Sequence, residues 1–356
     1  MVLLAASLAA SLGAQERERK QRGPRALAVL ETGGNEALPG TVNTGKQLTT
    51  GIGFPRLVPV TILENGEYHD ATVYKATPVP LAVQSGIVYE VLQTGASEGL
   101  FVIQQPNQLH GSWVGTGKLQ APSTEKSKPE APAATAQKSD EDEGPPRLRR
   151  SVEPPPVKAQ PAPPARAAAP KPVPVQPKRV LPHLLVAISD ATPYENRPYA
   201  YPWTPHWKAQ YTKEMLALAQ RALAAYGGCK PGKTSATSCA LTLAGVDVHA
   251  FDLETNNDAE IVLSARAQRN GQYLYVTVVG RVGSLGQVEK VFTTVTDDAH
   301  LDTTGRLEFI DAVDADGDGR GELLFRRLHN ASQTFELYRV GREQMWKLFD
   351  GAESSL

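Results

Sequence analysis

The chain has 356 residues, of which 41% are hydrophobic and 21% are charged, and its formal net charge is -1. A chain of this length and composition can bury one large core or two small ones. Its basic residues are not concentrated in either of the two domains expected below. The sequence therefore lacks the electrostatic signature of nucleic-acid binding, and we expect no nucleic-acid partner.

The chain begins with a short apolar segment. Residues 2–13 are almost all small or aliphatic, which is typical of the hydrophobic part of a secretory signal peptide. We expect residues 1–14 to be a signal peptide, and the mature protein to be secreted or to lie in the periplasm or cell envelope. No Lys or Arg precedes the apolar residues, so an ordinary helix of small residues is the alternative. No segment is long enough to span a bilayer, and we expect no transmembrane segment in the mature chain.

Residues 24–119 alternate between apolar and polar side chains in the manner of β-strands. We expect a small all-β domain here, with a long loop over residues 31–55. Asn65 and Gly66 favour the left-handed backbone of a tight hairpin. No motif in this domain indicates what it does. The predicted strands cover residues 25–30, 58–63, 71–74, 87–92 and 100–103.

Residues 120–180 are rich in proline, alanine and lysine, and they contain almost no aromatic or long aliphatic side chains. Such a segment cannot bury enough apolar surface to fold, and its prolines favour an extended polyproline II backbone. We therefore predict a disordered, proline-rich linker between two β domains.

Residues 181–356 are predicted to form the second domain. A strand at residues 183–189 comes first, and a helix at residues 204–226 follows it. Thr204 can cap this helix, Pro205 suits its first position, and Gly227 suits a left-handed exit. The apolar residues that recur at helical spacing predict the face that packs against the core; they are Trp207, Tyr211, Met215, Leu218 and Ala222.

Two cysteines, Cys229 and Cys239, follow the predicted helix. In an exported protein they would form a disulfide, whereas two free thiols are the alternative because spacing alone does not establish the bridging geometry. They do not predict a zinc site, since no histidine lies next to them.

An acidic loop near the C-terminus is the most informative motif in the sequence. Asp314, Asp316, Asp318 and Glu322 stand at positions 1, 3, 5 and 9 of this loop, and glycine stands at position 6. Carboxylates crowd together in this way when a cation offsets their repulsion, and calcium takes several oxygen ligands at once. The pattern therefore predicts a calcium site.

The same pattern occurs earlier in the chain. Residues 252–263 align with residues 314–325 so that the oxygen-bearing positions coincide, and asparagine replaces glycine at position 6. Downstream, Arg281 aligns with Arg339, which indicates two copies of a unit of roughly 60 residues. Each unit is predicted to be a four-stranded antiparallel meander: residues 246–251, 260–265, 273–279 and 288–296, with a hairpin at Asn270 and Gly271, then residues 307–313, 322–328, 335–340 and 345–349.

These two units resemble the FG-GAP or VCBS repeats of integrin-like β-propellers, whose Asp-x-Asp-x-Asp-Gly-x-x-Asp loops hold calcium between adjacent strands. The resemblance covers residues 246–350, and it implies a structural calcium site in each copy. In the second copy it implies side-chain ligands from Asp314, Asp316, Asp318 and Glu322, and a carbonyl ligand from Arg320. In the first copy the matching residues are Asp252, Glu254, Asn256 and Glu260, with Asp258 at the carbonyl position.

The acidic loops have two alternative interpretations, an EF-hand and a metal-free turn. An EF-hand needs a bidentate glutamate at position 12, which is Phe325 in the second loop, and it needs helices on both sides, where strands are predicted. A metal-free turn rich in aspartate and asparagine, which closes a hairpin through its own hydrogen bonds, is the alternative to calcium in both loops.

Two motifs resemble those of enzymes without their structural context. Residues 227–234, which include Lys233, match a P-loop, but this motif needs a preceding strand and a following helix, and here it follows a helix. Residues 95–99, which include Ser97, match a nucleophile elbow, but strands are predicted on both sides, so a hairpin turn is favoured. We therefore expect no enzymatic activity, and a hydrolase or an NTPase is the remote alternative.

The sequence as a whole predicts a mainly β fold with one prominent helix. It indicates an exported, non-enzymatic envelope or extracellular scaffold protein with a structural calcium site. Its partner would be an unknown envelope or extracellular protein or a glycan. A polysaccharide- or protein-binding adhesin is the alternative, because the aromatic residues Tyr199, Tyr201, Trp203 and Trp207 could stack on sugars, although packing over the helix is favoured.

Overall fold

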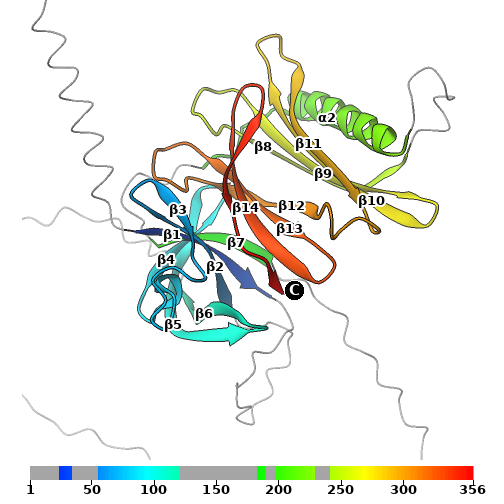
Figure 1. Ribbon diagram of the computed structural model, residues 1–356. Helices are drawn as coiled ribbons and strands as arrows, with labels where there is room; N and C mark the ends of the chain where they lie inside the picture. The colour runs from blue at the N-terminus through cyan, green and yellow to red at the C-terminus, as the bar shows by residue number, and fades with distance from the viewer. Residues whose placement is uncertain (1–23, 34–54, 121–182, 190–197, 229–240, 356) are drawn as a thin grey trace, which may run out of the picture. The chain divides into compact units, whose positions relative to one another are not determined.

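The computed structural model describes residues 24–33, 55–120, 183–189, 198–228 and 241–355. Contacts divide the chain into two units, residues 1–123 with 179–356 and residues 124–178, and every described residue belongs to the first unit. The predicted signal peptide, most of the linker and both cysteines lie outside the described residues. Within the described residues the fold is mainly β with one α-helix, as the sequence predicts (Figure 1).

The first sheet has seven antiparallel strands, in the order β1-β7-β4-β5-β6-β2-β3. Because β1 also pairs with β2, six of these strands close into a ring and β3 extends it at β2. A short 3-10 helix, η1 (Leu81–Val83), adds two buried residues to the core of this ring. The strands are β1 (Arg25–Thr32), β2 (Arg56–Glu64), β3 (Glu67–Asp70), β4 (Val88–Gln93), β5 (Ala96–Leu109), β6 (Ser112–Gln120) and β7 (His183–Ile188).

The position of β7 differs from the expected grouping of residues 181–356. This strand comes after the proline-rich segment in the sequence, yet it lies between β1 and β4 in the first sheet. The proline-rich segment is therefore not a boundary between the first sheet and the other two, because β7 follows this segment and belongs to the first sheet.

The strand predicted at residues 71–74 is wrong, because these residues form turns. The Asp70 carboxylate accepts the backbone N–H of Thr72 at 2.8 Å, and Lys75 has a left-handed φ of 47°. The hydrogen bond to Asp70 ends the strand there, and the backbone at Lys75 continues the turn. The hairpin predicted between β2 and β3 is confirmed, since Asn65 and Gly66 have φ values of 55° and 83°.

Successive side chains of β1 point to opposite faces of the sheet, and both faces are buried. Ala26, Ala28 and Leu30 fill the inside of the ring, whereas Leu27 and Val29 pack outward against the third sheet. This explains why β1 is almost continuously apolar instead of strictly alternating.

The second sheet is a four-stranded antiparallel meander, and the third has five strands, of which the first four form a meander, as predicted. They have the orders β11-β10-β9-β8 and β12-β13-β14-β15, and the short strand β16 (Ser354–Ser355) pairs with β14 in the third sheet. Asn270 and Gly271, with φ values of 50° and 83°, form the predicted hairpin between β9 and β10. The strands are β8 (Leu243–Phe251), β9 (Glu260–Arg269), β10 (Gln272–Val282), β11 (Val288–Asp297), β12 (Arg306–Val313), β13 (Glu322–Leu328), β14 (Ser332–Val340) and β15 (Met345–Asp350).

Helix α2 (Pro205–Tyr226) covers one face of the second sheet (Figure 1). The Thr204 hydroxyl accepts the backbone N–H of Trp207 at 3.3 Å, which confirms the predicted N-cap. The buried face consists of Tyr211, Met215, Ala219 and Leu223.

Two details of the helix prediction are wrong. Trp207, expected on the buried face, is 43% exposed, because the apolar face begins one turn later. Gly227 has an ordinary φ of -74°, and the left-handed residue at the helix exit is Gly228, with φ of 76°.

The third sheet buries both of its faces. Leu323 and Phe325 of β13 pack against the second sheet, and Leu324 between them packs against the first. Polar contacts add to this packing, since the Thr94 N–H at the β4–β5 turn donates to the buried carboxylate of Asp311 at 2.6 Å. The third sheet is therefore packed between the first sheet on one face and the second sheet on the other.

A buried ion pair stabilises the third sheet, and it predicts an acid-sensitive stability. The Glu336 carboxylate accepts hydrogen bonds from Arg327 at 2.7 and 2.8 Å and from Lys347 at 2.9 Å. Burial alone would raise the pKa of Glu336, but these hydrogen bonds outweigh it and hold the pKa below its ordinary value. The stabilisation is therefore present above the ordinary pKa of glutamate, near 4.3, and is lost as the pH falls through the lower folded-state value.

We expect Glu336→Gln to lower the free energy of unfolding by about 3 kcal/mol at neutral pH, because Arg327 loses its buried partner. Urea denaturation at several pH values measures this effect, and the difference from wild type should shrink below about pH 4. A difference that stays constant with pH would show that the charge of Glu336 contributes nothing to stability.

Candidate metal centre

The second acidic loop connects β12 to β13, and its own backbone wraps around one side chain. The Asp314 carboxylate accepts the N–H groups of Gly317, Asp318 and Gly319 at 2.6, 3.1 and 3.0 Å. Gly317 and Gly319 have left-handed φ values of 74° and 86°, a conformation that glycine adopts without steric cost. These turns bring the later residues of the loop back toward Asp314.

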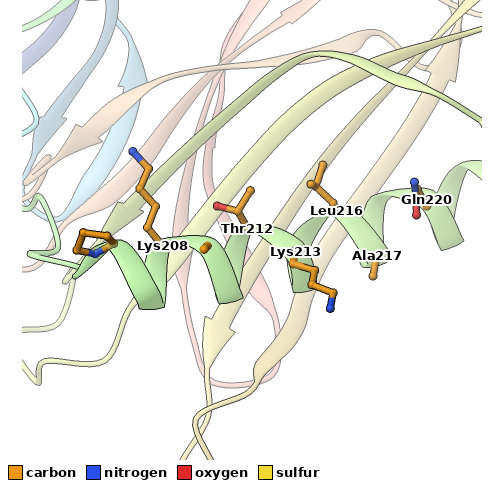
Figure 2. A pocket seen from close by; sticks show the side chains of 8 residues that line it. Lys208, Thr212, Lys213, Leu216, Ala217 and Gln220 are labelled. Atoms are coloured by element: carbon orange, nitrogen blue, oxygen red, sulfur yellow. The ribbon is translucent and has the colours of Figure 1, made fainter.

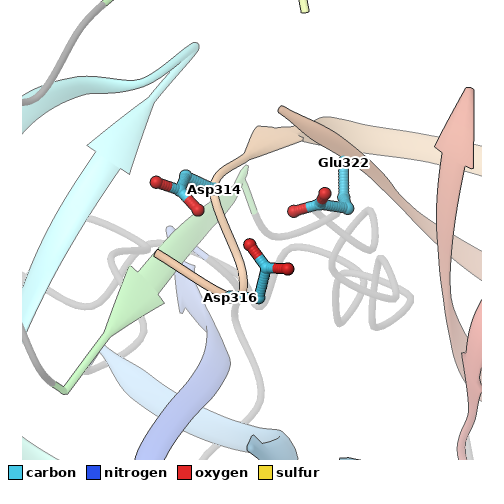
Figure 3. A group of neighbouring side chains, drawn as sticks. All are labelled: Asp314, Asp316 and Glu322. Carbon is cyan, nitrogen blue, oxygen red and sulfur yellow. The ribbon is translucent and has the colours of Figure 1, made fainter. Parts of the chain in front are cut away.

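Three acidic side chains converge in this loop. Asp314, Asp316 and Glu322 each place one carboxylate oxygen within 4.8 Å of the others (Figure 3). Glu322, the first residue of β13, is fully buried, and its Oε2 accepts the backbone N–H of Ala315 at 2.9 Å. This group of carboxylates could hold a metal ion.

Arg339 of β14 reaches into the same cluster. Its guanidinium lies 3.0 Å from Asp316 Oδ2 and 3.5 Å from Asp318 Oδ2, and its Nε donates to Glu322 Oε1 at 2.9 Å. Burial raises the pKa of Glu322 to about 8, and the negative charge of Asp316 adds to this effect while Arg339 opposes it. One guanidinium therefore offsets only part of the negative charge of the loop.

The chemistry of the donor groups fits a hard divalent cation. All the converging ligands are carboxylate oxygens, which suit calcium and magnesium better than softer metals. Beside them lies the Tyr68 hydroxyl of β3, a buried polar group without a hydrogen-bond partner in the described structure. A buried hydroxyl of this kind is commonly satisfied by an ion site or a water molecule.

Two residues of the predicted ligand set lie outside the converging group. Asp318 shares Arg339 with the cluster, and its Oδ1 accepts the N–H of Arg320 at 2.9 Å. Arg320, expected to offer its carbonyl, lies in the same loop with an exposed side chain.

The first acidic loop, between β8 and β9, has the same backbone course as the second. Thr255 and Asn257 have left-handed φ values of 60° and 62° at the positions of Gly317 and Gly319. Glu260 Oε2 accepts the N–H of Leu253 at 3.0 Å, as Glu322 does from Ala315. Asn257 therefore supplies the left-handed residue that the sequence predicts at position 6.

An arginine also holds the carboxylates of the first loop. Arg281 lies 2.7 Å from Asp258 and 3.7 Å from both Glu254 and Glu260. Burial raises the pKa of Glu260 to about 7, although the hydrogen bond from Leu253 and the charge of Arg281 oppose this rise.

The remaining predicted ligands of the first loop also make hydrogen bonds within the loop. Asp252 Oδ1 accepts the N–H of Asn256 at 3.1 Å, and the Asn256 amide donates to Glu254 at 3.2 Å. Among the residues that the structure describes, only the second loop brings three acidic groups together at metal-binding spacing.

The two acidic loops touch each other. The Gly321 N–H donates to the Leu253 carbonyl at 2.9 Å, and a Cβ at Gly321 would lie only 2.7 Å from the Leu253 side chain. Tyr199, one of the aromatic residues that could stack on sugars, is buried at this junction. Tyr201 and Trp203 pack against the core formed by α2 and the second sheet, whereas Trp207 is exposed, so the favoured packing role is confirmed for three of the four aromatic residues.

The motifs that resemble enzyme sites gain no support. Ser97 lies in β5 opposite Leu92, just after a hairpin turn at Thr94 and Gly95, and not at a strand-to-helix turn. Lys233 lies outside the described residues.

Arg281, Arg339 and Tyr68 are not among the site residues predicted from the sequence. For the two arginines a signal was available, since each stands at the same place in its repeat unit and could pair with the preceding acidic loop. For Tyr68 no local signal exists, because it reaches the loop from another sheet.

No protein-family model, curated protein or solved structure is significantly similar to this chain. None of the described helices combines the length and apolar character needed to cross a bilayer. The geometry of the acidic loops is therefore the main evidence for the function.

The contacts of Arg339 predict that its guanidinium contributes measurably to the free energy of unfolding. In the presence of a chelator we expect Arg339→Gln to lower the free energy of unfolding by about 2 kcal/mol, because Glu322 then lacks a positive partner. Arg320→Gln in the same loop is the matched control, since the Arg320 side chain is exposed, and it should change stability by about 0.5 kcal/mol or less. Equal effects of the two substitutions in chemical denaturation would contradict this assignment.

Proposed function

We propose that this chain is an exported, non-enzymatic scaffold or binding protein of the cell envelope or extracellular space, with a structural calcium site in its third sheet. The observation that carries the proposal is the convergence of Asp314, Asp316 and Glu322 in a loop whose four carboxylates outnumber the two arginines beside it, Arg25 and Arg339. Calcium would supply the missing positive charge and fix the loop between the antiparallel strands β12 and β13.

Calcium is favoured over other ions by the donor atoms and their number. It binds six to eight oxygens in flexible geometry, and carboxylates together with a backbone carbonyl provide such a set. The proposed ligands are the carboxylates of Asp314, Asp316, Asp318 and Glu322 and the carbonyl of Arg320, in line with the resemblance to FG-GAP or VCBS repeats. For the first loop, Asp252, Glu254, Asn256, Asp258 and Glu260 form the corresponding proposed set.

A structural role is favoured over catalysis by the surroundings of the loop. Its carboxylates are engaged by backbone N–H groups, and Glu322 is fully buried. A hollow of about 700 Å³ lies along α2, and the described residues that line it, among them Lys208, Thr212 and Leu216, include no acidic group (Figure 2). It therefore offers no carboxylate for acid–base chemistry.

A glycan- or protein-binding adhesin is the second candidate, and two neighbouring tyrosines of β10 favour it, the exposed Tyr273 and the half-buried Tyr275. The rings of Tyr273 and Tyr275 lie 6.4 Å apart, and Tyr273 is 40% exposed. Arg266 lies 5.5 Å from the Tyr273 ring and Arg306 lies 5.0 Å from the Tyr275 ring. Exposed flat rings suit the faces of sugars, so binding on a glycan array that Tyr273→Ala abolishes would establish this function.

The calcium proposal predicts stabilisation of the full-length chain by mass action. At a calcium concentration about 100 times the dissociation constant, the free energy of unfolding should rise by about 2.7 kcal/mol relative to chelator. Asp316→Asn removes one ligand charge and should weaken calcium binding in titration calorimetry and reduce the shift in Tm.

Asp350→Asn is the control, because Asp350 belongs to the same sheet but is exposed and pairs with Lys347. It should leave calcium binding unchanged. If wild-type melting is identical in chelator and in excess calcium, the calcium site does not exist and the arginines alone neutralise the loops.

A further inference from the structure

The hydroxyl of Tyr68 is buried without a partner at the edge of the acidic loop. Tyr68 lies in β3 of the first sheet, opposite Leu63, and its ring packs against the core cluster that contains Val313 and Ala315. These two residues flank Asp314. The hydroxyl oxygen has almost no exposed surface and makes no hydrogen bond in the described structure.

The packing of Tyr68 against Val313 and Ala315 puts it near the acidic loop, and the electrostatics of its hydroxyl agree with that position. Burial raises the pKa of the Tyr68 phenol, the charges of Glu322 and Asp316 raise it further, and Arg339 opposes them. The phenol therefore keeps its proton and remains a hydrogen-bond donor next to a group of strong acceptors.

A second contact shows that the first sheet adjoins this loop. Arg25, the first residue of β1, donates from Nη2 to the carbonyl of Asp314 at 2.8 Å. The first position of the loop is therefore held from β1, while the ring of Tyr68 packs beside it from β3. The two strands lie on either side of β2 in the same sheet.

We propose that Tyr68 is a positioning residue of the metal centre, whose hydroxyl donates a hydrogen bond to an oxygen ligand of the bound cation. The proposal rests on the proposed calcium site and extends it to a residue of the first sheet. A buried donor without an acceptor is unfavourable, and a rearrangement of the carboxylates around an ion would provide the acceptor. Binding of the ion would then fasten the loop to the first sheet.

Tyr68→Phe tests this role in the full-length chain, because it removes the hydroxyl and keeps the ring. We expect the dissociation constant for calcium, measured by titration calorimetry, to rise about tenfold, as for the loss of one hydrogen bond to a charged group. Melting in chelator should stay the same or improve, since the hydroxyl has no partner in the metal-free protein. Near-ultraviolet circular dichroism verifies that the variant is folded.

Tyr89→Phe is the matched control, because it removes another buried hydroxyl of the first sheet, one that donates to the Ala82 carbonyl at 2.7 Å. It should lower Tm in chelator and in calcium alike without changing calcium affinity. Unchanged calcium affinity of Tyr68→Phe would overturn the proposal, and so would equal destabilisation with and without calcium. Failure of wild type to bind calcium would instead overturn the proposed function itself.

Discussion

The buried carboxylate of Glu322 is the constraint on which the architecture of the acidic loop depends. A buried carboxyl group is unfavourable unless its oxygens are hydrogen-bonded, and its ionised form also needs a positive partner. Here one oxygen receives the N–H of Ala315 and the other receives the guanidinium of Arg339. These contacts determine where the loop turns and which strand it faces. Glu260 and Arg281 make the corresponding arrangement in the first loop.

Much of the fold could be predicted from the sequence because its signals are local. Alternating residues predict all four strands of both meanders, and Asn270 with Gly271 predicts the hairpin between β9 and β10. The left-handed residue at position 6 of each acidic loop follows from Asn257 and Gly319 in the same way. The place of β7 was not predictable, because pairing between strands far apart in sequence leaves no periodic pattern in either of them.

The residues of the candidate site also differ in whether the sequence alone could predict them. Its carboxylates are neighbours in sequence, so their spacing reveals the loop directly. Arg339 comes from β14 and Tyr68 from the first sheet, and only the folded structure brings them to Asp316 and Glu322. The interplay of burial and pairing around Glu322 also depends on the packing of three sheets and has no counterpart in any short stretch of sequence.

The insertion of β7 between β1 and β4 has a consequence for biosynthesis. While the ribosome is still translating the residues before His183, the strands already made cannot close their ring, and β1 and β4 each keep an unpaired edge. Such edges invite pairing with other chains, so the nascent protein is most prone to aggregation during this interval. In the folded protein, the parts of the chain before β7 and after it are joined by the hydrogen bonds of β7 and by the contacts of Arg25 and Thr94 with Asp314 and Asp311.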